Sequence, residues 1–251
     1  MKIHFLGTGT STGNPEIGCH CKVCTSKDKK DWRLRASVVV EVAGVHILID
    51  CGPDFRWQMI RSGLLELDAV LITHEHYDHV GGLDDLRPFC KVKGLDVYAE
   101  DYVVEAIRSR IPYAFREQKY PGVPDLNLVS VAHAPFFIKG VEIVPIRLMH
   151  GRLPIFGYRV GNMAYLTDLK IIPEEEYPLL EGLEVLIIDA LRDEEHLSHE
   201  TVEQALRHIE KIRPKRACLI HMSHHFGLHA EREKLLPENV FISYDGLVLE
   251  L

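Results

Sequence analysis

The sequence predicts an α/β protein in which two mixed β-sheets pack against each other and helices cover them, an αββα sandwich. Two observations support this fold class. Short strand-like runs of apolar residues recur near both ends of the chain, and helical segments separate the later runs. At 251 residues the chain is long enough to bury such a core. We expect one domain over residues 1–251.

In the first half of the chain, strands are predicted where runs rich in Val, Ile and Leu end at turn residues. In chain order these strands are 2–7, 37–42, 45–49, 68–73 and 96–99. Ala43-Gly44 supplies the turn of a hairpin. The segments expected to be helical are 54–62, 83–90 and 100–111. Residues 112–125 contain three prolines and are predicted to form a surface loop.

The second half of the chain begins with closely spaced strands and ends with a helix between strands. The expected strands are 126–131, 136–138, 141–148, 156–160, 163–166, 185–188, 216–220, 240–243 and 247–249. A short helix is predicted at 174–180. The strongest helical pattern covers 199–213, because its apolar residues share one face, with Ser198 as the expected N-cap and Pro214 marking the end.

The composition indicates a cytoplasmic protein that does not bind membranes. No apolar run reaches the length of a transmembrane helix, and the first residues break at glycines too early for a signal peptide. The net charge of −8 argues against a nonspecific nucleic-acid binder, without excluding RNA as a partner. Basic residues do cluster between positions 27 and 35, but aspartates interrupt them, which is typical of a solvated loop.

Side chains that bind metals are concentrated directly after the predicted strand 68–73. This segment contains His74, His76, Asp78 and His79, followed by two glycines. Imidazoles and a carboxylate packed this densely after a buried strand suit a metal ion. Further acidic or histidine residues follow apolar runs elsewhere, namely Asp50, His150, Asp168 and His221. Each alone is an ordinary strand end, but together they predict one site at the rim of a sheet.

The cysteines predict a second metal site. Of six cysteines, Cys19, Cys21 and Cys24 lie within six residues, and the others are scattered in apolar settings. This is not the spacing of a disulfide framework, and in a cytosolic chain it indicates a metal. Tetrahedral zinc needs a fourth ligand. The candidates are His20, which lies too close in sequence to fold back easily, and a distant residue.

The order of these residues resembles the metallo-β-lactamase fold superfamily over nearly the whole chain. The motif His-x-His-x-Asp-His is specific for that superfamily but not for one reaction. The resemblance implies two divalent ions, zinc or manganese, that share Asp168. The first would be held by His74, His76, His150 and Asp168, and the second by Asp78, His79, Asp168 and His221. Asp50 would orient a ligand histidine.

The cysteine spacing is similar to the PhnP subgroup, the phosphoribosyl cyclic phosphodiesterases. There three thiolates share a structural zinc with a histidine three residues after the last catalytic histidine, which is His224 here. Such a zinc would staple the loop at about 14–35 to the rim of the site. In PhnP-like and tRNase Z-like proteins a histidine that opens the helix before the final metal strand is the general acid. His199 matches that position, with His196 as the alternative.

The resemblance implies a metal-dependent hydrolase of small, cyclic phosphodiesters. A metal-bridging hydroxide would attack phosphorus and His199 would protonate the leaving oxygen, with His199 and Asp78 as catalytic residues. Three alternatives stay open. They are a tRNase Z-like endoribonuclease, which the acidic composition disfavours, a non-catalytic PqqB-like carrier, whose relatives often lack ligands that this chain retains, and a glyoxalase-type thioesterase. The expected partner is a small phosphodiester substrate, and a homodimer is a further expectation.

Overall fold

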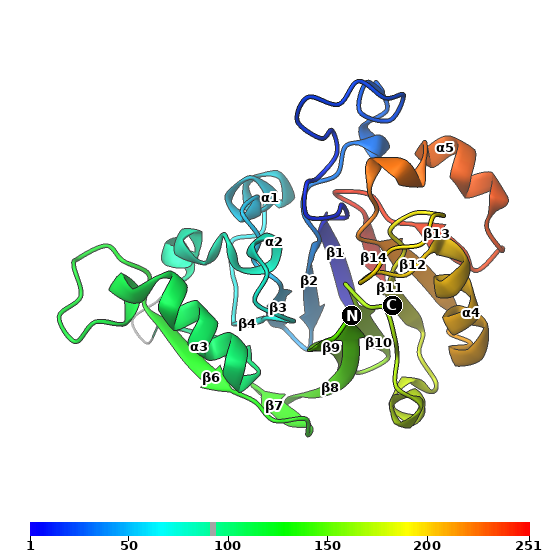
Figure 1. Ribbon diagram of the computed structural model, residues 1–251. Coiled ribbons are helices and arrows are strands. Elements are labelled where there is room, and N and C mark those ends of the chain that lie inside the picture. The colour runs from blue at the N-terminus through cyan, green and yellow to red at the C-terminus, as the bar shows by residue number, and fades with distance from the viewer. Residues whose placement is uncertain (91–93) are drawn as a thin grey trace.

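The structure is a computed structural model that describes residues 1–90 and 94–251. It confirms the predicted fold class. Two mixed sheets of seven strands each pack against one another, and helices flank them (Figure 1). Apolar clusters fill three layers, one between the sheets and one under the helices on each side.

The first sheet has the strand order β14-β1-β2-β3-β4-β5-β6. The bounds are β14 (Val248–Glu250), β1 (Lys2–Gly7), β2 (Ser37–Val42), β3 (Val45–Ile49), β4 (Ala69–Leu71), β5 (Leu95–Ala99) and β6 (Leu126–Ser130). Strands β3 to β6 run parallel, whereas β14, β1, β2 and β3 pair antiparallel. Since β3 and β4 are parallel neighbours, the residues that follow them emerge at the same edge.

The second sheet has the order β13-β12-β11-β10-β9-β8-β7. The bounds are β13 (Val240–Ile242), β12 (Arg216–Ile220), β11 (Val185–Asp189), β10 (Met163–Leu166), β9 (Leu153–Val160), β8 (Val141–His150) and β7 (Phe136–Ile138). Strands β10 to β13 are parallel, and β7 to β10 pair antiparallel. The residues that follow β10, β11 and β12 therefore also share an edge.

The inner faces of both sheets supply the central core. Ile47 and Leu71 of the first sheet and Ile187 of the second are fully buried there. Tyr158 on β9 is also buried, and its hydroxyl donates a 2.8 Å hydrogen bond to the carbonyl of Ile72, just beyond β4. This bond links the second sheet to the segment that leads into residues 74–79.

Helices cover the outer faces of the sheets. On the first sheet lie α1 (Phe55–Ser62) and α3 (Asp101–Arg110), and on the second lies α4 (Val202–Ile212). The shorter helical elements are α2 (Tyr77–Val80), α5 (His229–Arg232) and the 3₁₀ segments Lys29–Asp31, Leu83–Phe89, Pro112–Phe115, Glu174–Leu180, His224–Phe226 and Glu233–Leu235. The segments predicted as helices at 83–90 and 174–180 are thus 3₁₀, each with an internal proline that lacks the N–H an α-helix needs.

The predicted start of the helix at 199–213 is wrong. The helix begins at Val202, and its N-cap is Thr201 rather than Ser198. Thr201 Oγ1 accepts a hydrogen bond from the backbone N–H of Gln204, and the Gln204 side chain accepts one from the backbone N–H of Thr201. This capping box satisfies two N–H groups at once, which a serine three residues earlier cannot do. His199 therefore precedes the helix instead of opening it.

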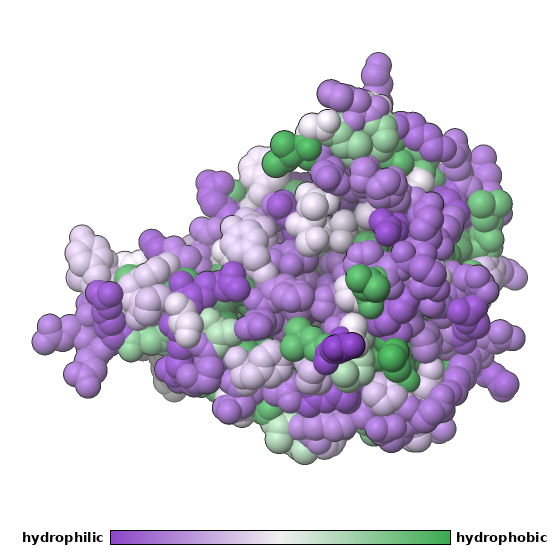
Figure 2. All heavy atoms as spheres, in the orientation of Figure 1, coloured by the Kyte–Doolittle hydropathy of each residue, from purple (hydrophilic) through white to green (hydrophobic). Residues whose placement is uncertain are grey.

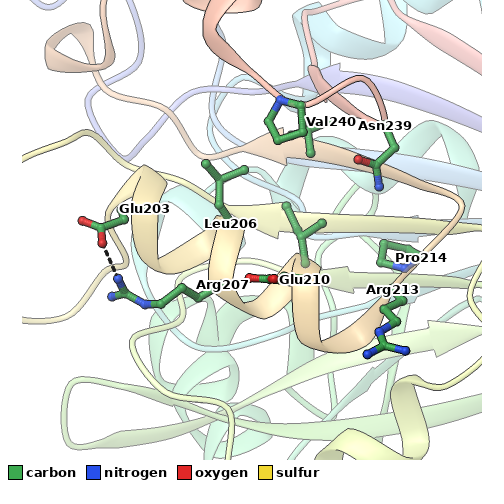
Figure 3. Close-up of a pocket in the computed structure, with 10 residues that line it drawn as sticks. Glu203, Leu206, Arg207, Glu210, Arg213, Pro214, Asn239 and Val240 are labelled. Carbon is green, nitrogen blue, oxygen red and sulfur yellow. Dashed lines mark hydrogen bonds and ion pairs between the residues drawn. The ribbon is translucent and has the colours of Figure 1, made fainter.

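The molecular surface is mostly polar on the face shown in Figure 2, with scattered hydrophobic residues. Among residues 1–90 and 94–251, no helix is long and apolar enough to cross a membrane. A cavity of about 550 Å³ lies where α4 meets the segment before β13 (Figure 3). Its lining includes Leu206 and Val240 but none of the predicted metal ligands, so it lies apart from the chemistry described next.

Candidate metal centres

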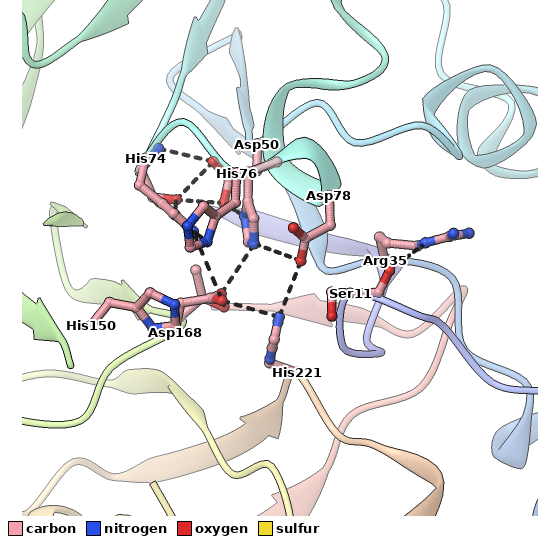
Figure 4. Close-up of polar contacts among 12 residues, drawn as sticks. Ser11, Arg35, Asp50, His74, His76, Asp78, His150, Asp168 and His221 are labelled. Carbon is pink, nitrogen blue, oxygen red and sulfur yellow. Dashed lines mark hydrogen bonds and ion pairs between the residues drawn. The ribbon is translucent and has the colours of Figure 1, made fainter. Parts of the chain in front are cut away.

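The predicted ligands of the binuclear site lie at strand ends of both sheets. From the first sheet come Asp50, directly after β3, and residues 74–79, which follow β4 and include α2. The second sheet supplies His150 at the end of β8, Asp168 after β10 and His221 after β12. The structure brings these side chains together in one cluster (Figure 4). Their role as metal ligands stays a prediction.

Three residues of this cluster have left-handed backbone conformations. The φ angles of Asp50, Asp168 and His221 are 63°, 55° and 61°. Residues with side chains rarely adopt this region, because Cβ approaches the following carbonyl at a cost of about 1–2 kcal/mol. Glycine would relieve that strain, but it could not place a carboxylate or an imidazole. At these three positions the role of the side chain in the cluster therefore outweighs the cost of the strained backbone to stability.

The first group of ligand atoms belongs to His74, His76 and His150, all within 4.8 Å of one another. His74 Nε2 lies 3.0 Å from His76 Nδ1 and 3.9 Å from Asp168 Oδ1. His150 donates a 3.0 Å hydrogen bond from Nδ1 to the carbonyl of Ser198, which leaves Nε2 for a ligand. His74 and His150 are buried, whereas His76 is exposed, so the group is open to solvent at His76.

The second group contains Asp78, His79, Asp168 and His221, all buried. His79 Nε2 lies 3.2 Å from Asp78 Oδ2 and 3.2 Å from Asp168 Oδ2. His221 Nε2 lies 3.3 Å from Asp168 Oδ1 and 3.6 Å from Asp78 Oδ2. Asp168 therefore reaches both groups, as expected for a bridging carboxylate.

The second group fits a divalent metal ion. His79 Nε2 and His221 Nε2 are buried without a hydrogen-bond partner among the described residues, although two carboxylates lie beside them. Buried polar atoms are rarely left unsatisfied. Nitrogen and carboxylate ligands converging in this way suit zinc, manganese or a similar ion.

The electrostatics of the second group favour a cation. Burial opposes ionisation of Asp168, but His221 and His79 hold the pKa of its carboxyl well below the usual range. Burial likewise lowers the pKa of His79, yet the carboxylates of Asp168 and Asp78 outweigh it and raise that pKa well above its ordinary value. The carboxylates thus stay ionised and attract positive charge into the cluster.

Asp50 lies behind the ligands, where the resemblance had placed it. Its carboxylate accepts a 2.7 Å hydrogen bond from His79 Nδ1 and a 2.9 Å bond from the backbone N–H of Thr73. The Thr73 hydroxyl lies 3.0 Å from both carboxylate oxygens. Asp50 therefore fixes the ring of His79 with Nε2 facing the second group.

His199 faces the cluster and His196 lies outside it. His199 is buried, its Nε2 is 3.9 Å from Asp168 Oδ1, and its ring centroid is 4.9 Å from that of His221. Burial lowers the pKa of His199 to about 4. His196 is only partly buried, its ring centroid is 5.0 Å from that of His199, and it belongs to none of the ligand groups. Of the two candidates for the general acid, the geometry favours His199.

Asp189 was not predicted as a site residue, although the pattern that identified Asp50 and Asp168 also applies to it. It is the last residue of β11 and is fully buried. His199 Nδ1 donates a 2.9 Å hydrogen bond to Asp189 Oδ2, and Asp189 Oδ1 is 3.8 Å from His221 Nδ1. Like Asp50 and Asp168, it is a carboxylate at the end of an apolar run. It was overlooked because that predicted strand ended one residue too early, at position 188.

The cysteine cluster is a separate group of four. Sulfurs of Cys19, Cys21 and Cys24 and a nitrogen of His224 lie within 4.8 Å of one another, and all six cysteines are free of disulfides. His224 Nδ1 is 3.2 Å from Cys19 Sγ and 3.4 Å from Cys21 Sγ. His20 is exposed and is not part of the group. Three sulfurs and one nitrogen at this spacing suit tetrahedral zinc.

Neighbouring groups prepare the cysteine cluster for a cation. Glu16 Oε2 lies 3.0 Å from His224 Nε2, which leaves Nδ1 directed at the sulfurs. Burial raises the pKa of Cys21, but hydrogen bonds from the backbone of Cys24 and from His224 outweigh it and bring that pKa to about 6. A thiolate is the form that binds metal. Burial raises the pKa of Cys24 to about 12, so Cys21 ionises more readily than Cys24 before a metal binds. The cluster joins the irregular segment before β2 to the residue three positions after His221.

Loss of this site should be measurable as loss of metal. We expect Cys19→Ser and His224→Ala each to bind about one equivalent of zinc less than the unmodified protein, since a structural site needs all four ligands. Metal analysis of the purified proteins measures this. Cys90→Ser is the control, because Cys90 lies outside the cluster and should leave the zinc content unchanged. Full zinc content in both variants would contradict the assignment.

Comparison with known proteins identifies the family. Residues 46–222 match the family described as Beta-lactamase superfamily domain, which is more than half of the chain. A crystal structure described as a new diphosphatase from the PhnP family superimposes with a TM-score of 0.93 at 37% sequence identity, covering 100% of this chain and 97% of that one.

Curated relatives carry other names. An octanoyltransferase of Porphyromonas gingivalis is 51% identical over 250 residues, which is 98% of this chain and 51% of that protein. A ribonuclease Z of Thermosynechococcus vestitus is 34% identical over 166 residues, which is 64% of this chain and 36% of that protein. The chain thus spans about half the length of the first relative and about a third of the second.

The family match spans all seven residues that form the two ligand groups, and the PhnP-family structure aligns over the full length of the chain. The chain therefore belongs to the β-lactamase superfamily and, within it, to the PhnP family.

Proposed function

We propose that the chain is a metal-dependent phosphodiesterase that hydrolyses small, cyclic phosphodiesters. The observation that carries the proposal is the position of Asp168, whose carboxylate reaches both ligand groups and lies 3.9 Å from the candidate general acid His199. The PhnP-family neighbour at 37% identity is a diphosphatase, and that reaction also breaks a bond between phosphorus and a bridging oxygen.

The residues of the cluster have two roles. The ligand groups would bind the metal ions, and His199 would transfer a proton. Two divalent ions, when bound by the two groups, would activate water and neutralise charge on the phosphoryl oxygens. His74 and His79, held by neighbouring groups at their Nδ1 atoms, present Nε2 to these positions. Because the ligands sit on strand ends of two packed sheets, their geometry is rigid before substrate arrives.

His199 is placed to donate a proton to the leaving oxygen. Its Nδ1 is held by Asp189 and its Nε2 faces the space beside Asp168. Because burial lowers the pKa of His199 to about 4, its imidazolium is a strong proton donor. The imidazolium would pass its Nε2 proton to the departing alkoxide and would then be reprotonated from solvent, while Asp189 holds the ring at Nδ1. Asp189 thus positions His199 in the way that Asp50 positions His79.

An endoribonuclease is the second candidate, because the relative from Thermosynechococcus vestitus is a ribonuclease Z. The same groups could act on a phosphodiester in RNA. The net charge of −8 counts against it, since RNA binding draws on a basic surface. We do not propose acyl transfer, because the relative named octanoyltransferase is matched over only 51% of its length.

A substrate profile of the metal-loaded protein tests the proposal. We expect hydrolysis of bis(p-nitrophenyl) phosphate and of cyclic phosphodiesters such as 2′,3′-cyclic AMP, with activity lost on chelation and restored by zinc or manganese. Cleavage of a precursor tRNA with no turnover of small phosphodiesters would favour the endoribonuclease instead. A metal-loaded protein that cleaves none of these substrates would overturn the proposal.

A further inference from the structure

The three cysteines of the zinc cluster lie close enough together to react with one another. The sulfurs of Cys19, Cys21 and Cys24 are within 4.8 Å of each other, and all three are free of disulfides. A disulfide requires a distance of about 2.05 Å between its sulfurs. A small movement of two side chains therefore separates the metal-binding form of the cluster from a disulfide.

Cys21 and Cys24 are the pair best placed to form that bond. They are three residues apart on a tight turn, in which the backbone N–H of Thr25 donates a 3.0 Å hydrogen bond to the carbonyl of Cys21. The backbone N–H of Cys24 donates a 3.4 Å hydrogen bond to Cys21 Sγ. The spacing Cys-x-x-Cys is the one that disulfide oxidoreductases use for reversible oxidation. Cys19 and Cys21 are separated by one residue, a spacing at which a disulfide is more strained.

The two thiols of this pair differ in their access to solvent. Cys21 is partly exposed, whereas Cys24 is buried at 7% exposure. An oxidant that arrives from solvent therefore meets Cys21 first, and Cys24 is left to complete the disulfide. An accessible cysteine beside a second, resolving cysteine is typical of redox sensors.

Oxidation of the pair by hydrogen peroxide balances without any further reactant. The Cys21 thiolate attacks one peroxide oxygen and breaks the O–O bond, which gives a sulfenic acid and hydroxide. The Cys24 thiolate then attacks the Cys21 sulfur and expels a second hydroxide, and solvent protons convert both hydroxides to water. The thiol pair loses the two electrons that peroxide gains. Because thiolates are the form that binds metal, zinc then loses two of its four ligands.

The cluster also anchors the segment that carries the last ligand of the binuclear site. His224 is three residues after His221, whose backbone has a φ angle of 61°. A strained backbone persists only where the surrounding structure holds it. Hydrogen bonds of 3.1 Å that join Met222 to Thr8 and Thr10 contribute to this support. Loss of zinc removes the link from His224 to the sulfurs, which is a further part of it.

We propose that the cysteine cluster is a redox switch. Peroxide converts Cys21 and Cys24 to a disulfide, which releases the zinc and loosens the segment that carries His221. A dithiol reductant returns two electrons and two protons to the pair and is itself oxidised to a disulfide, after which zinc binds again. The switch goes beyond the hydrolytic reaction, because it concerns the thiols and their zinc and no substrate takes part in it.

Thiol labelling and metal analysis of the zinc-loaded protein test the switch. We expect peroxide to lower the zinc content by about one equivalent and to protect Cys21 and Cys24 from alkylation. Mass spectrometry should find the two residues joined in one peptide, and dithiothreitol followed by zinc should restore both quantities. Hydrolysis of bis(p-nitrophenyl) phosphate should fall about tenfold in the oxidised protein and recover, because lost support behind a metal ligand costs about 10–100-fold.

The variant Cys21→His separates the disulfide from the metal site. Histidine supplies a nitrogen ligand but not the thiol that starts the reaction, so peroxide should release zinc from this variant about tenfold more slowly. Cys90→Ser is the matched control, because Cys90 is also partly exposed but lies outside the cluster, and it should respond like the unmodified protein.

Zinc release without a disulfide between Cys21 and Cys24, or a disulfide that leaves the zinc bound, would overturn the switch. Equal rates of release from Cys21→His and the unmodified protein would do the same. Peptide analysis of the unmodified protein decides the question by itself if Cys21→His binds no zinc. These measurements need no substrate, so a protein that cleaves no phosphodiester loses the proposed function and keeps the switch.

Discussion

Replacement of Asp168 by asparagine is expected to lower hydrolysis of phosphodiesters by about a thousandfold or more, because several kcal/mol of transition-state stabilisation depend on the shared carboxylate. Its oxygens lie 3.2 Å from His79 Nε2, 3.3 Å from His221 Nε2 and 3.9 Å from His74 Nε2. Asparagine tolerates the left-handed backbone at φ 55°, so the substitution changes charge without adding strain. The variant should also retain less metal.

Rate measurements and metal analysis of Asp168→Asn are to be compared with Asp125→Asn. Asp125 pairs with Lys119 on the surface and lies outside the ligand groups, so its substitution should leave both quantities unchanged. Circular dichroism of the two variants shows whether the fold is intact. An Asp168→Asn protein that keeps its rate and its metal would contradict the assignment of a bridging ligand.

Replacement of His199 by alanine is expected to have an effect that depends on the leaving group. A general acid contributes about 10²–10⁴-fold when the departing oxygen is a poor leaving group. The ribose oxygen of 2′,3′-cyclic AMP is such a group, whereas p-nitrophenolate departs without a proton. His199→Ala should therefore lose most of its activity on the cyclic nucleotide and little on bis(p-nitrophenyl) phosphate. Asp189→Asn should show the same pattern in weaker form, because it weakens the 2.9 Å hydrogen bond that holds His199 but leaves the proton-donating ring in place. Metal analysis of this variant shows whether His221, 3.8 Å from Asp189, still binds its ion.

The leaving-group comparison separates chemistry from structure. Damage to the fold or to metal binding would reduce both reactions equally, which would argue against His199 as the proton donor. His133→Ala is the matched control, since His133 contacts Glu176 and lies outside the ligand groups. Both substrates should be hydrolysed at the unmodified rate by that variant.

The strands and the ligand set could be predicted because they follow local rules. Runs of aliphatic residues such as the one ending at Ile49 have no helical period, and a polar residue directly after a buried run must sit at a sheet edge. The same rule applied to β10 and β12 finds Asp168 and His221. Parallel pairing of neighbouring strands then brings those edges together.

The errors have equally local causes. The helix after His199 was predicted to begin too early, because Ser198 is a good N-cap residue. In the structure the capping box of Thr201 and Gln204 satisfies more backbone groups, and the helix begins after it. Asp189 was lost because the predicted strand 185–188 stopped one residue short. A short helix, α2, forms within the histidine motif itself, where the sequence analysis predicted no helix.

One cavity of the structure, lined among others by Asn14, Trp32 and Trp57, could not be predicted from the sequence for a different reason. Asn14, Trp32 and Trp57 come from three separate segments, and no spacing rule connects them. Their meeting depends on how the segment before β2 folds over α1, which is a tertiary contact. Each residue alone reads as an ordinary loop or helix residue.

The origin of the ligands in two sheets has a consequence for how the protein assembles. Residues 74–79 come from the first sheet, and His150, Asp168 and His221 from the second; the cysteine cluster likewise joins an early segment to His224 near the other end of the chain. Neither half of the chain alone presents a full coordination sphere. Bound ions would then act as cross-links between the halves, and tight metal uptake would appear only after the sheets have docked. Retention of metal by the protein would therefore indicate that both sheets have folded and docked.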